Sequence, residues 1–165
     1  MNKGCLLVLT VVFLQACVSA PVRQDFISDI KDKVQIPDFI DVSYCTIYGG
    51  GKLPKTYRGV CSISDTSVVL HYSNNVENTG KARTSVIEHK NIIKVAHAKS
   101  MRNTQMQING VLKLVVVTLT NKVGFIDGKK TEEWLSYFRQ KNVVVTEAED
   151  LIAEPTQGYY IRYSY

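Results

Sequence analysis

The stretch KLVVVTLTNKVGFIDGKKTEEWLSYFRQ, residues 113–140, changes its hydrophobic period from that of a strand to that of a helix. Its first half belongs to an apolar, β-branched run that predicts strands at 111–120 and 122–126. Its second half places Trp134, Leu135 and Phe138 on one helical face. The change of period predicts a single amphipathic helix that packs its tryptophan against a β core.

Polar and charged residues mark both ends of this helix. Thr131 is expected to act as the N-cap, which puts Glu132 and Glu133 in the first turn, at the positive end of the helix dipole. Arg139 and Lys141 lie in the last turn, where positive charge is favourable. The residue pattern therefore predicts a helix that begins at Thr131.

Upstream of this stretch, short alternating or β-branched segments predict five further strands, which makes seven in all. We expect them at 42–48, 57–64, 67–73, 84–89 and 92–98.

A short amphipathic segment precedes the strands. Phe26, Ile27, Ile30 and Val34 share one helical face, and Pro37 ends the pattern. The opposite face is largely acidic, whereas a helix that lies on a membrane is usually basic there. We expect this segment to pack back on the domain.

Seven strands followed by one amphipathic helix resemble the pleckstrin-homology-like superfold. The likeness is carried by CSISDTSVVLHY at 61–72, NIIKV at 91–95 and the stretch at 113–140. It implies a mainly β (α+β) fold: a seven-stranded antiparallel sandwich or partly open barrel, with two near-orthogonal sheets capped by one C-terminal helix. A different small sandwich or barrel with a capping helix would give a similar pattern.

The first twenty residues, MNKGCLLVLTVVFLQACVSA, have the features of a secretory signal. Lys3 precedes an apolar run, Leu6 to Leu14, that is too short to cross a bilayer, since a spanning helix needs roughly 20 apolar residues. A buried N-terminal strand, or cleavage after Ala20, is the alternative, although Pro21 directly after that site is unfavourable.

Residues Leu14 to Cys17, LQAC, resemble the lipobox of bacterial lipoproteins. The resemblance implies a diacylglyceryl group on the Cys17 thiol, cleavage before Cys17, and acylation of the new amino group with a fatty acid such as palmitate. Several acyl chains anchor a protein stably. Val18 stands where an aspartate would imply retention at the inner membrane, so the resemblance favours the periplasmic face of the outer membrane over the inner membrane or the cell surface.

On this interpretation the chain has four parts, and its charge is modest. They are a signal peptide at 1–16, a lipidated tether with the short helix at 17–41, the β domain with its helix at 42–142, and a tail or extra strand at 143–165. The whole chain has a net charge of +5, which falls to +4 once Lys3 leaves with the signal. This charge suits an anionic envelope surface, and nucleic acid is not expected to be a partner of an exported chain.

Two cysteines, Cys45 and Cys61, remain for the folded domain and lie in adjacent predicted strands. If the hairpin turns at Leu53, the two residues are directly opposed. An oxidising periplasm would then allow a disulfide, with two unpaired core thiols as the alternative. Redox or metal chemistry is not expected, because the chain has no C-x-x-C motif.

Basic residues are concentrated between Lys81 and Arg102. If Arg83, Lys99 and Arg102 border neighbouring loops, they could bind an anion, although strand alternation would also place several of these side chains on solvated faces.

The sequence contains no pattern typical of catalysis, a metal site or a cofactor. His71, His89 and His97 fall in predicted strands without an acidic partner at ligand spacing. Ser62 and Ser64 lack a nucleophile elbow, and GGGK at 49–52 lacks the spacing of a phosphate-binding loop.

Two function classes remain. The first is a non-catalytic, lipid-anchored interaction module that holds another envelope protein through a strand edge, the basic loops or the tyrosine-rich tail GYYIRYSY at 158–165. The second is a binder of an anionic ligand or lipid headgroup through the basic loops between Lys81 and Arg102.

The lipobox leads to a direct prediction about Cys17. We expect Cys17→Ser to leave unprocessed precursor or to release soluble protein, because no other residue can accept the thioether-linked lipid. Intact-mass analysis of the wild type checks this expectation. A mature chain that starts at Pro21 without added acyl mass would contradict it.

Overall fold

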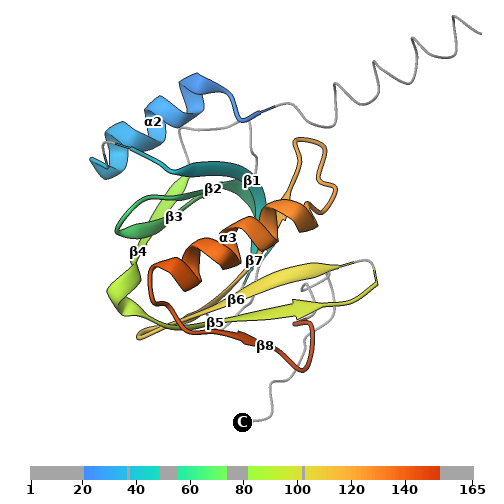
Figure 1. Ribbon diagram of the computed structural model, residues 1–165. Coiled ribbons are helices and arrows are strands. Elements are labelled where there is room, and N and C mark those ends of the chain that lie inside the picture. Colours follow the sequence, from blue (N-terminus) through green and yellow to red (C-terminus); the bar gives the residue numbers. More distant parts are fainter. Residues whose placement is uncertain (1–20, 37, 49–55, 74–81, 102, 153–165) are drawn as a thin grey trace, which may run out of the picture.

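The computed structural model describes residues 21–36, 38–48, 56–73, 82–101 and 103–152, and all structural statements concern these residues. Strands dominate this part of the chain, and two α-helices accompany them (Figure 1). The elements in chain order are α2 (Gln24–Val34), β1 (Asp41–Tyr48), β2 (Thr56–Ile63), β3 (Ser67–Ser73), β4 (Arg83–Glu88), the 3-10 turn η2 (His89–Asn91), β5 (Ile92–Lys99), β6 (Thr104–Gly110), β7 (Leu114–Thr120), α3 (Gly128–Gln140) and β8 (Val145–Glu147).

The strands form one continuous sheet of eight, in the order β4-β3-β2-β1-β7-β6-β5-β8. All neighbours are antiparallel except β8, which runs parallel to β5. Figure 1 shows that the sheet curls, so that α3 lies between the half formed by β1 to β4 and the half formed by β5 to β8. The prediction of a mainly β fold with a helix against the core is confirmed. The predicted number of seven strands is wrong, and the strands form one sheet.

The error lies in the region 104–126. Strand β6 (Thr104–Gly110) was not predicted, because Gln105 and Gln107 alternate with its apolar residues and hide its core face. The strand predicted at 122–126 is wrong, because that segment is a connection with a single bridge between Thr120 and Ile126.

Helix α3 supplies the centre of the inner core. Trp134, Leu135 and Phe138 are buried in the main cluster, as their shared helical face predicts. The predicted N-cap, Thr131, is wrong: the helix starts earlier, and Asp127 caps it through a 2.9 Å hydrogen bond to the backbone N–H of Lys130. Thr131 is fully buried, and its hydroxyl donates to the Asp127 carbonyl instead.

Asp41, at the start of β1, fastens this helix to the sheet. Its carboxylate accepts a 2.5 Å hydrogen bond from the Trp134 indole N–H and lies 3.1 Å from the Lys130 ammonium. Partial burial alone would lower the pKa of Lys130, but its contacts with Asp41 and Glu133 raise that pKa above its ordinary value. The indole therefore has its polar partner, which a buried tryptophan needs.

Helix α2 covers the outer face of β1 to β3. Ile30 is buried against Val60 and Val69, and Phe26, Ile27 and Val34 pack around this second cluster. The expectation that the N-terminal amphipathic segment packs back on the domain is confirmed. As a result, strands β2 and β3 contribute buried apolar residues on both faces.

The segment after α3 runs to the edge of the sheet opposite β4. Within it, β8 pairs with β5. This strand lies in the region 143–165, which was expected to be a tail or an extra strand. Farther on, the buried Gln105 side chain hydrogen-bonds both the N–H and the C=O of Ile152, and Gln107 donates to the Asp150 carbonyl. Tyr48 also donates to the Ile152 carbonyl. The buried glutamines of β6 thus hold this segment by its backbone.

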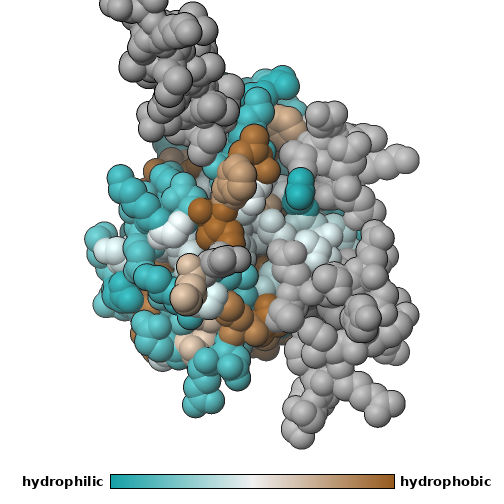
Figure 2. Space-filling view, turned by 90° about the vertical axis from the view of Figure 1, so that its right-hand side faces the viewer, coloured by the Kyte–Doolittle hydropathy of each residue, from teal (hydrophilic) through white to brown (hydrophobic). Residues whose placement is uncertain are grey.

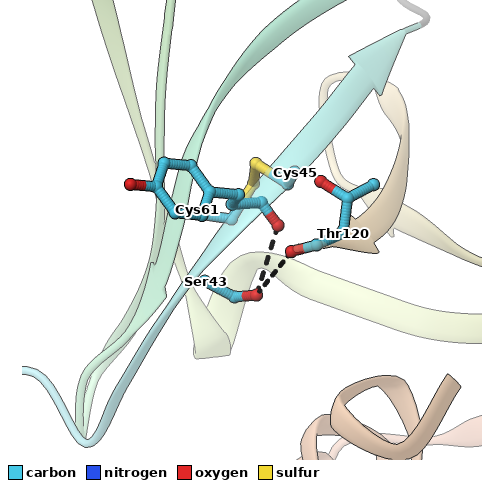
Figure 3. The surroundings of a disulfide bond; sticks show 5 residues. Ser43, Cys45, Cys61 and Thr120 are labelled. Atoms are coloured by element: carbon cyan, nitrogen blue, oxygen red, sulfur yellow. Dashed lines mark hydrogen bonds between the residues drawn. A yellow bond between two sulfur atoms is a disulfide. The ribbon is translucent and has the colours of Figure 1, made fainter. Parts of the chain in front are cut away.

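A disulfide joins Cys45 of β1 to Cys61 of β2, with the two Cα atoms 5.8 Å apart (Figure 3). The predicted register is wrong by two residues, because Cys45 faces Gly59 and Cys61 faces Ser43. The two cysteines are diagonal neighbours on the core face, where both are buried. Ser43, beside them, donates to the carbonyl oxygens of Tyr44 and Thr120 at 3.2 and 3.5 Å.

The position of α3 leads to a stability prediction for Trp134. We expect Trp134→Ala to unfold or nearly unfold the domain, because truncating a buried tryptophan costs about 3–5 kcal/mol and its side chain is only 1 % exposed. Ser136→Ala, on the exposed face of the same helix, is the matched control and should change little. Urea unfolding of both variants measures the effect. Equal midpoints for Trp134→Ala and the wild type would contradict the assignment.

Candidate anion-binding site

A pocket of about 460 Å³ opens on the outer side of the sheet, between the start of α2, strands β1 and β2, and the connection from β7 to α3. We call it the basic pocket. Its lining residues are Arg23, Phe26, Tyr44, Cys45, Thr46, Arg58, Gly59, Thr120, Asn121, Lys122 and Gly124. In Figure 1, the β7–α3 connection projects on the right-hand side of the molecule. The first turn of α2 is the end of that helix nearer to this side.

Secondary structure positions the walls of the pocket. Arg23 is the N-cap residue of α2, and Phe26 packs in the outer cluster in the first turn of that helix. On the facing wall, β2 approaches β3 so closely that a Cβ atom at Gly59 would lie 2.1 Å from the His71 carbonyl oxygen. Only glycine fits there, so this part of the wall is backbone next to Arg58.

The third wall is the β7–α3 connection, Asn121–Asp127. The Asn121 side chain accepts hydrogen bonds from the backbone N–H groups of Val123 and Phe125 at 3.1 and 3.0 Å. Gly124 has φ of +97°, a conformation that favours glycine. These contacts fix the shape of the connection and set Lys122 at the pocket.

The charged residues that line the pocket are all basic: Arg23, Arg58 and Lys122. Arg23 is paired with Asp25, and its guanidinium hydrogen bond lowers the pKa of that carboxyl group. Within the described part of the chain, the side chains of Arg58 and Lys122 have no hydrogen bond or ion pair. Two uncompensated cations therefore face one hollow, which favours an anionic occupant.

The anion-binding residues predicted from the sequence lie elsewhere. Arg83 is on β4 and Lys99 is on β5, which are separated by five strands in the sheet order, and both are exposed. Neither lines the basic pocket. Lys81 and the side chain of Arg102 lie outside the described residues.

Sequence reasoning missed Arg23, Arg58 and Lys122, which come from three distant segments. Each is one basic residue in an ordinary surface pattern. The pairing of β1 with both β2 and β7 and the packing of α2 on the sheet bring the three segments together. The concentration of charge along the chain between Lys81 and Arg102 was the stronger signal, but it does not translate into proximity in the fold.

The histidines occupy separate places. His71, on the outer face of β3, lies with Nδ1 2.8 Å from the Thr84 hydroxyl, and burial lowers its pKa. His97, on β5, contacts Thr104 at 2.8 Å. His89 is not in a strand as predicted, because it starts the turn η2, where it contacts the rings of Tyr137 and Phe138.

The remaining chemical candidates do not form a site in the part that the structure describes. No group of three or more histidine, cysteine, aspartate or glutamate side chains is arranged to hold a metal ion among these residues. The Ser64 hydroxyl hydrogen-bonds Ser67 within a turn. The GGGK loop, Cys17 and the tail GYYIRYSY fall outside the described residues. Among the described helices, none has the length and hydropathy needed to cross a bilayer.

Comparisons with known proteins give little. No family model matches the chain, and no curated protein sequence matches it significantly. Among solved structures, it is similar to the C-terminal domain of an unknown protein from Leishmania infantum, with 12% identity, a TM-score of 0.47, and coverage of 70% of this chain and 97% of that one. It is also similar to the hSac2 domain from the human phosphoinositide phosphatase Sac2, with 14% identity, a TM-score of 0.47, and coverage of 86% and 98%. These scores are too low to transfer a property from either protein.

Proposed function

We propose that this chain is a lipid-anchored, non-catalytic binding module of a bacterial cell envelope that holds an anionic ligand in the basic pocket. The observation that carries the proposal is the pocket lining, in which Arg23, Arg58 and Lys122 are the charged groups and no carboxylate is present. The ligand class is a phosphate-bearing molecule, either free or as a lipid headgroup, because arginine and lysine together suit phosphate oxygens.

The lining also supports a binding role without catalysis. Besides its cations it contributes the hydroxyl groups of Thr46 and Thr120 and the ring of Tyr44, but no histidine or carboxylate that could act as a general base. Cations, hydroxyl groups and aromatic rings together can orient and hold an anion.

The envelope location rests on the lipobox, and one structural feature supports it. A buried disulfide such as Cys45–Cys61 is typical of an oxidising compartment, and the bacterial periplasm is one. The outer-membrane destination of the lipid on Cys17 remains part of the proposal.

We also assign the domain to the pleckstrin-homology-like superfold as a proposal. Its support is the antiparallel order β4-β3-β2-β1-β7-β6-β5 with α3 directly after β7. Strand β8 and helix α2 are additions to that pattern.

Substitutions in the pocket test the ligand proposal. Arg58→Gln and Lys122→Gln should each weaken binding of glycerol phosphate about tenfold or more, because a hydrogen bond to a charged group contributes about 1.5–3 kcal/mol. Isothermal titration calorimetry at low and high salt measures the loss, and binding to the wild type should weaken with salt. Arg83→Gln, outside the pocket, is the charge-matched control. Equal losses for Arg83→Gln and Arg58→Gln would place the anion elsewhere.

A second candidate function is the capture of another envelope protein at the β4 edge. Strand β4 ends the described sheet order, so one side of Arg83–Glu88 pairs with no described strand. Val86 is 46 % exposed there, and an apolar hollow of about 290 Å³ adjoins it, lined partly by Val111 and Leu112. An edge strand beside an apolar hollow suits addition of a partner's strand.

In-cell crosslinking separates this candidate from the first. A photo-crosslinker at Val86 should capture a discrete protein from intact cells if the edge is used. In a second experiment the crosslinker is placed at another position, such as Ile93, and Val86 is either kept or changed to proline. Val86→Pro should abolish the capture, because proline cannot donate a backbone hydrogen bond. A crosslinker at the exposed Lys129 on α3 is the control. The same products from Val86 and Lys129 would reject the edge as a specific site.

A further inference from the structure

We infer that the β7–α3 connection is a membrane-contact loop. Val123 and Phe125 enter the headgroup and upper acyl region of an anionic bilayer, while the adjoining basic pocket takes the phosphate of a phospholipid. This inference rests on the proposed function, because the same pocket supplies the phosphate site, and it names the bilayer surface as the source of the ligand.

The connection presents apolar side chains to solvent. Val123 is 55 % exposed and Phe125 is 67 % exposed, and Ile126 follows them. Figure 2 looks onto the side of the molecule that carries the connection and shows apolar surface running between polar side chains. Single exposed apolar residues are common, but a phenylalanine and two aliphatic residues on one short connection form a patch that favours contact with an apolar phase.

The backbone of the connection holds these side chains outward in a defined shape. Asn121 bonds the connection from both its main chain and its side chain: its N–H donates to the Phe125 carbonyl at 2.8 Å, and its side chain accepts from Val123 and Phe125. The Asp127 N–H donates to the Leu119 carbonyl at 2.9 Å, which closes the base of the connection. Since the shape is already fixed, the loop loses little conformational freedom when it enters a membrane.

Residues that line the basic pocket alternate with exposed apolar residues on this connection. Asn121, Lys122 and Gly124 line the basic pocket, while Val123 and Phe125 between and after them are exposed. A bilayer surface presents phosphates above an apolar layer, so an approaching loop can place Lys122 and Arg58 at phosphate level and Phe125 below it. The charge of the pocket matches an anionic membrane.

The expected anchor keeps the pocket close to a membrane. Arg23, a pocket residue, lies six residues after Cys17. Even a fully extended chain of this length spans at most about 22 Å. If Cys17 carries lipid, the basic pocket cannot move farther than this from the bilayer surface along that tether.

The β6–β7 hairpin provides a matched control. Leu112 is 94 % exposed and Val111 also is exposed, so this hairpin, like the connection, presents apolar side chains to solvent. It lies at the opposite end of β7, away from the pocket, and its neighbour Lys113 donates to Ser85 at 3.2 Å. If exposure of apolar side chains were enough, both the β6–β7 hairpin and the β7–α3 connection would bind a membrane. Only the connection adjoins the basic pocket, so only the connection should bind.

Depth-dependent fluorescence quenching tests the inference on the full mature chain. Phe125→Trp and Leu112→Trp are each mixed with vesicles of brominated phosphatidylcholine, with or without phosphatidylglycerol, and the signal of the buried Trp134 is subtracted using the wild type. We expect quenching of Phe125→Trp in vesicles that contain phosphatidylglycerol and its loss when Arg58→Gln and Lys122→Gln are added. Leu112→Trp should stay unquenched.

The outcomes separate this inference from the proposed function. Equal quenching at both tips, or none at Phe125→Trp, overturns the membrane-contact loop. If glycerol phosphate still binds the wild type and not the pocket variants, the anion site stands without the bilayer, and the ligand is a free molecule. A concentration-dependent blue shift of Phe125→Trp without vesicles would show that the loop packs on a second copy of the chain, which also overturns the inference.

Discussion

The carboxylate of Asp41 is the contact on which the arrangement of this domain depends. It lies at the start of β1, in the middle of the sheet order, and it accepts from the Trp134 indole while it pairs with Lys130. Burying the indole without a partner for its N–H would cost about 1–3 kcal/mol, the penalty of an unsatisfied buried donor. Asp41 thus joins β1 to two successive turns of α3, at Lys130 and at Trp134.

The position of α3 in turn shapes the candidate site. The helix starts at Gly128 under the cap of Asp127, and the backbone of Asp127 is bonded to Leu119 at the end of β7. The connection between these two elements must therefore leave the sheet and return within a few residues, with Lys122 and Phe125 at its tip. The inner core and the basic pocket share this constraint, because the helix that fills one also fixes a wall of the other.

The outer face of the sheet is used twice. On β1 to β3 it is covered by α2, which brings Arg23 beside the strands, and on β6 its buried glutamines bind the backbone of Asp150 and Ile152. Burying Gln105 and Gln107 is tolerated because their amide groups have partners. The pocket lies where the first of these coverings leaves β1 and β2 open.

The sequence by itself determined the features that depend on local periodicity: six of the strands, the apolar face of α3, the amphipathic α2 and the mainly β class. It failed where a polar residue is buried or an apolar one is exposed. Gln105 and Gln107 concealed β6, the exposed Val111 and Leu112 extended the predicted strand beyond β7, and the buried Thr131 imitated a cap.

Only the tertiary structure decided the register that makes Cys45 and Cys61 diagonal neighbours and the meeting of Arg23, Arg58 and Lys122. The physical reason is that strand pairing and helix docking join residues far apart in the chain, and the charge pattern along a sequence contains no information about which of its members will share a surface.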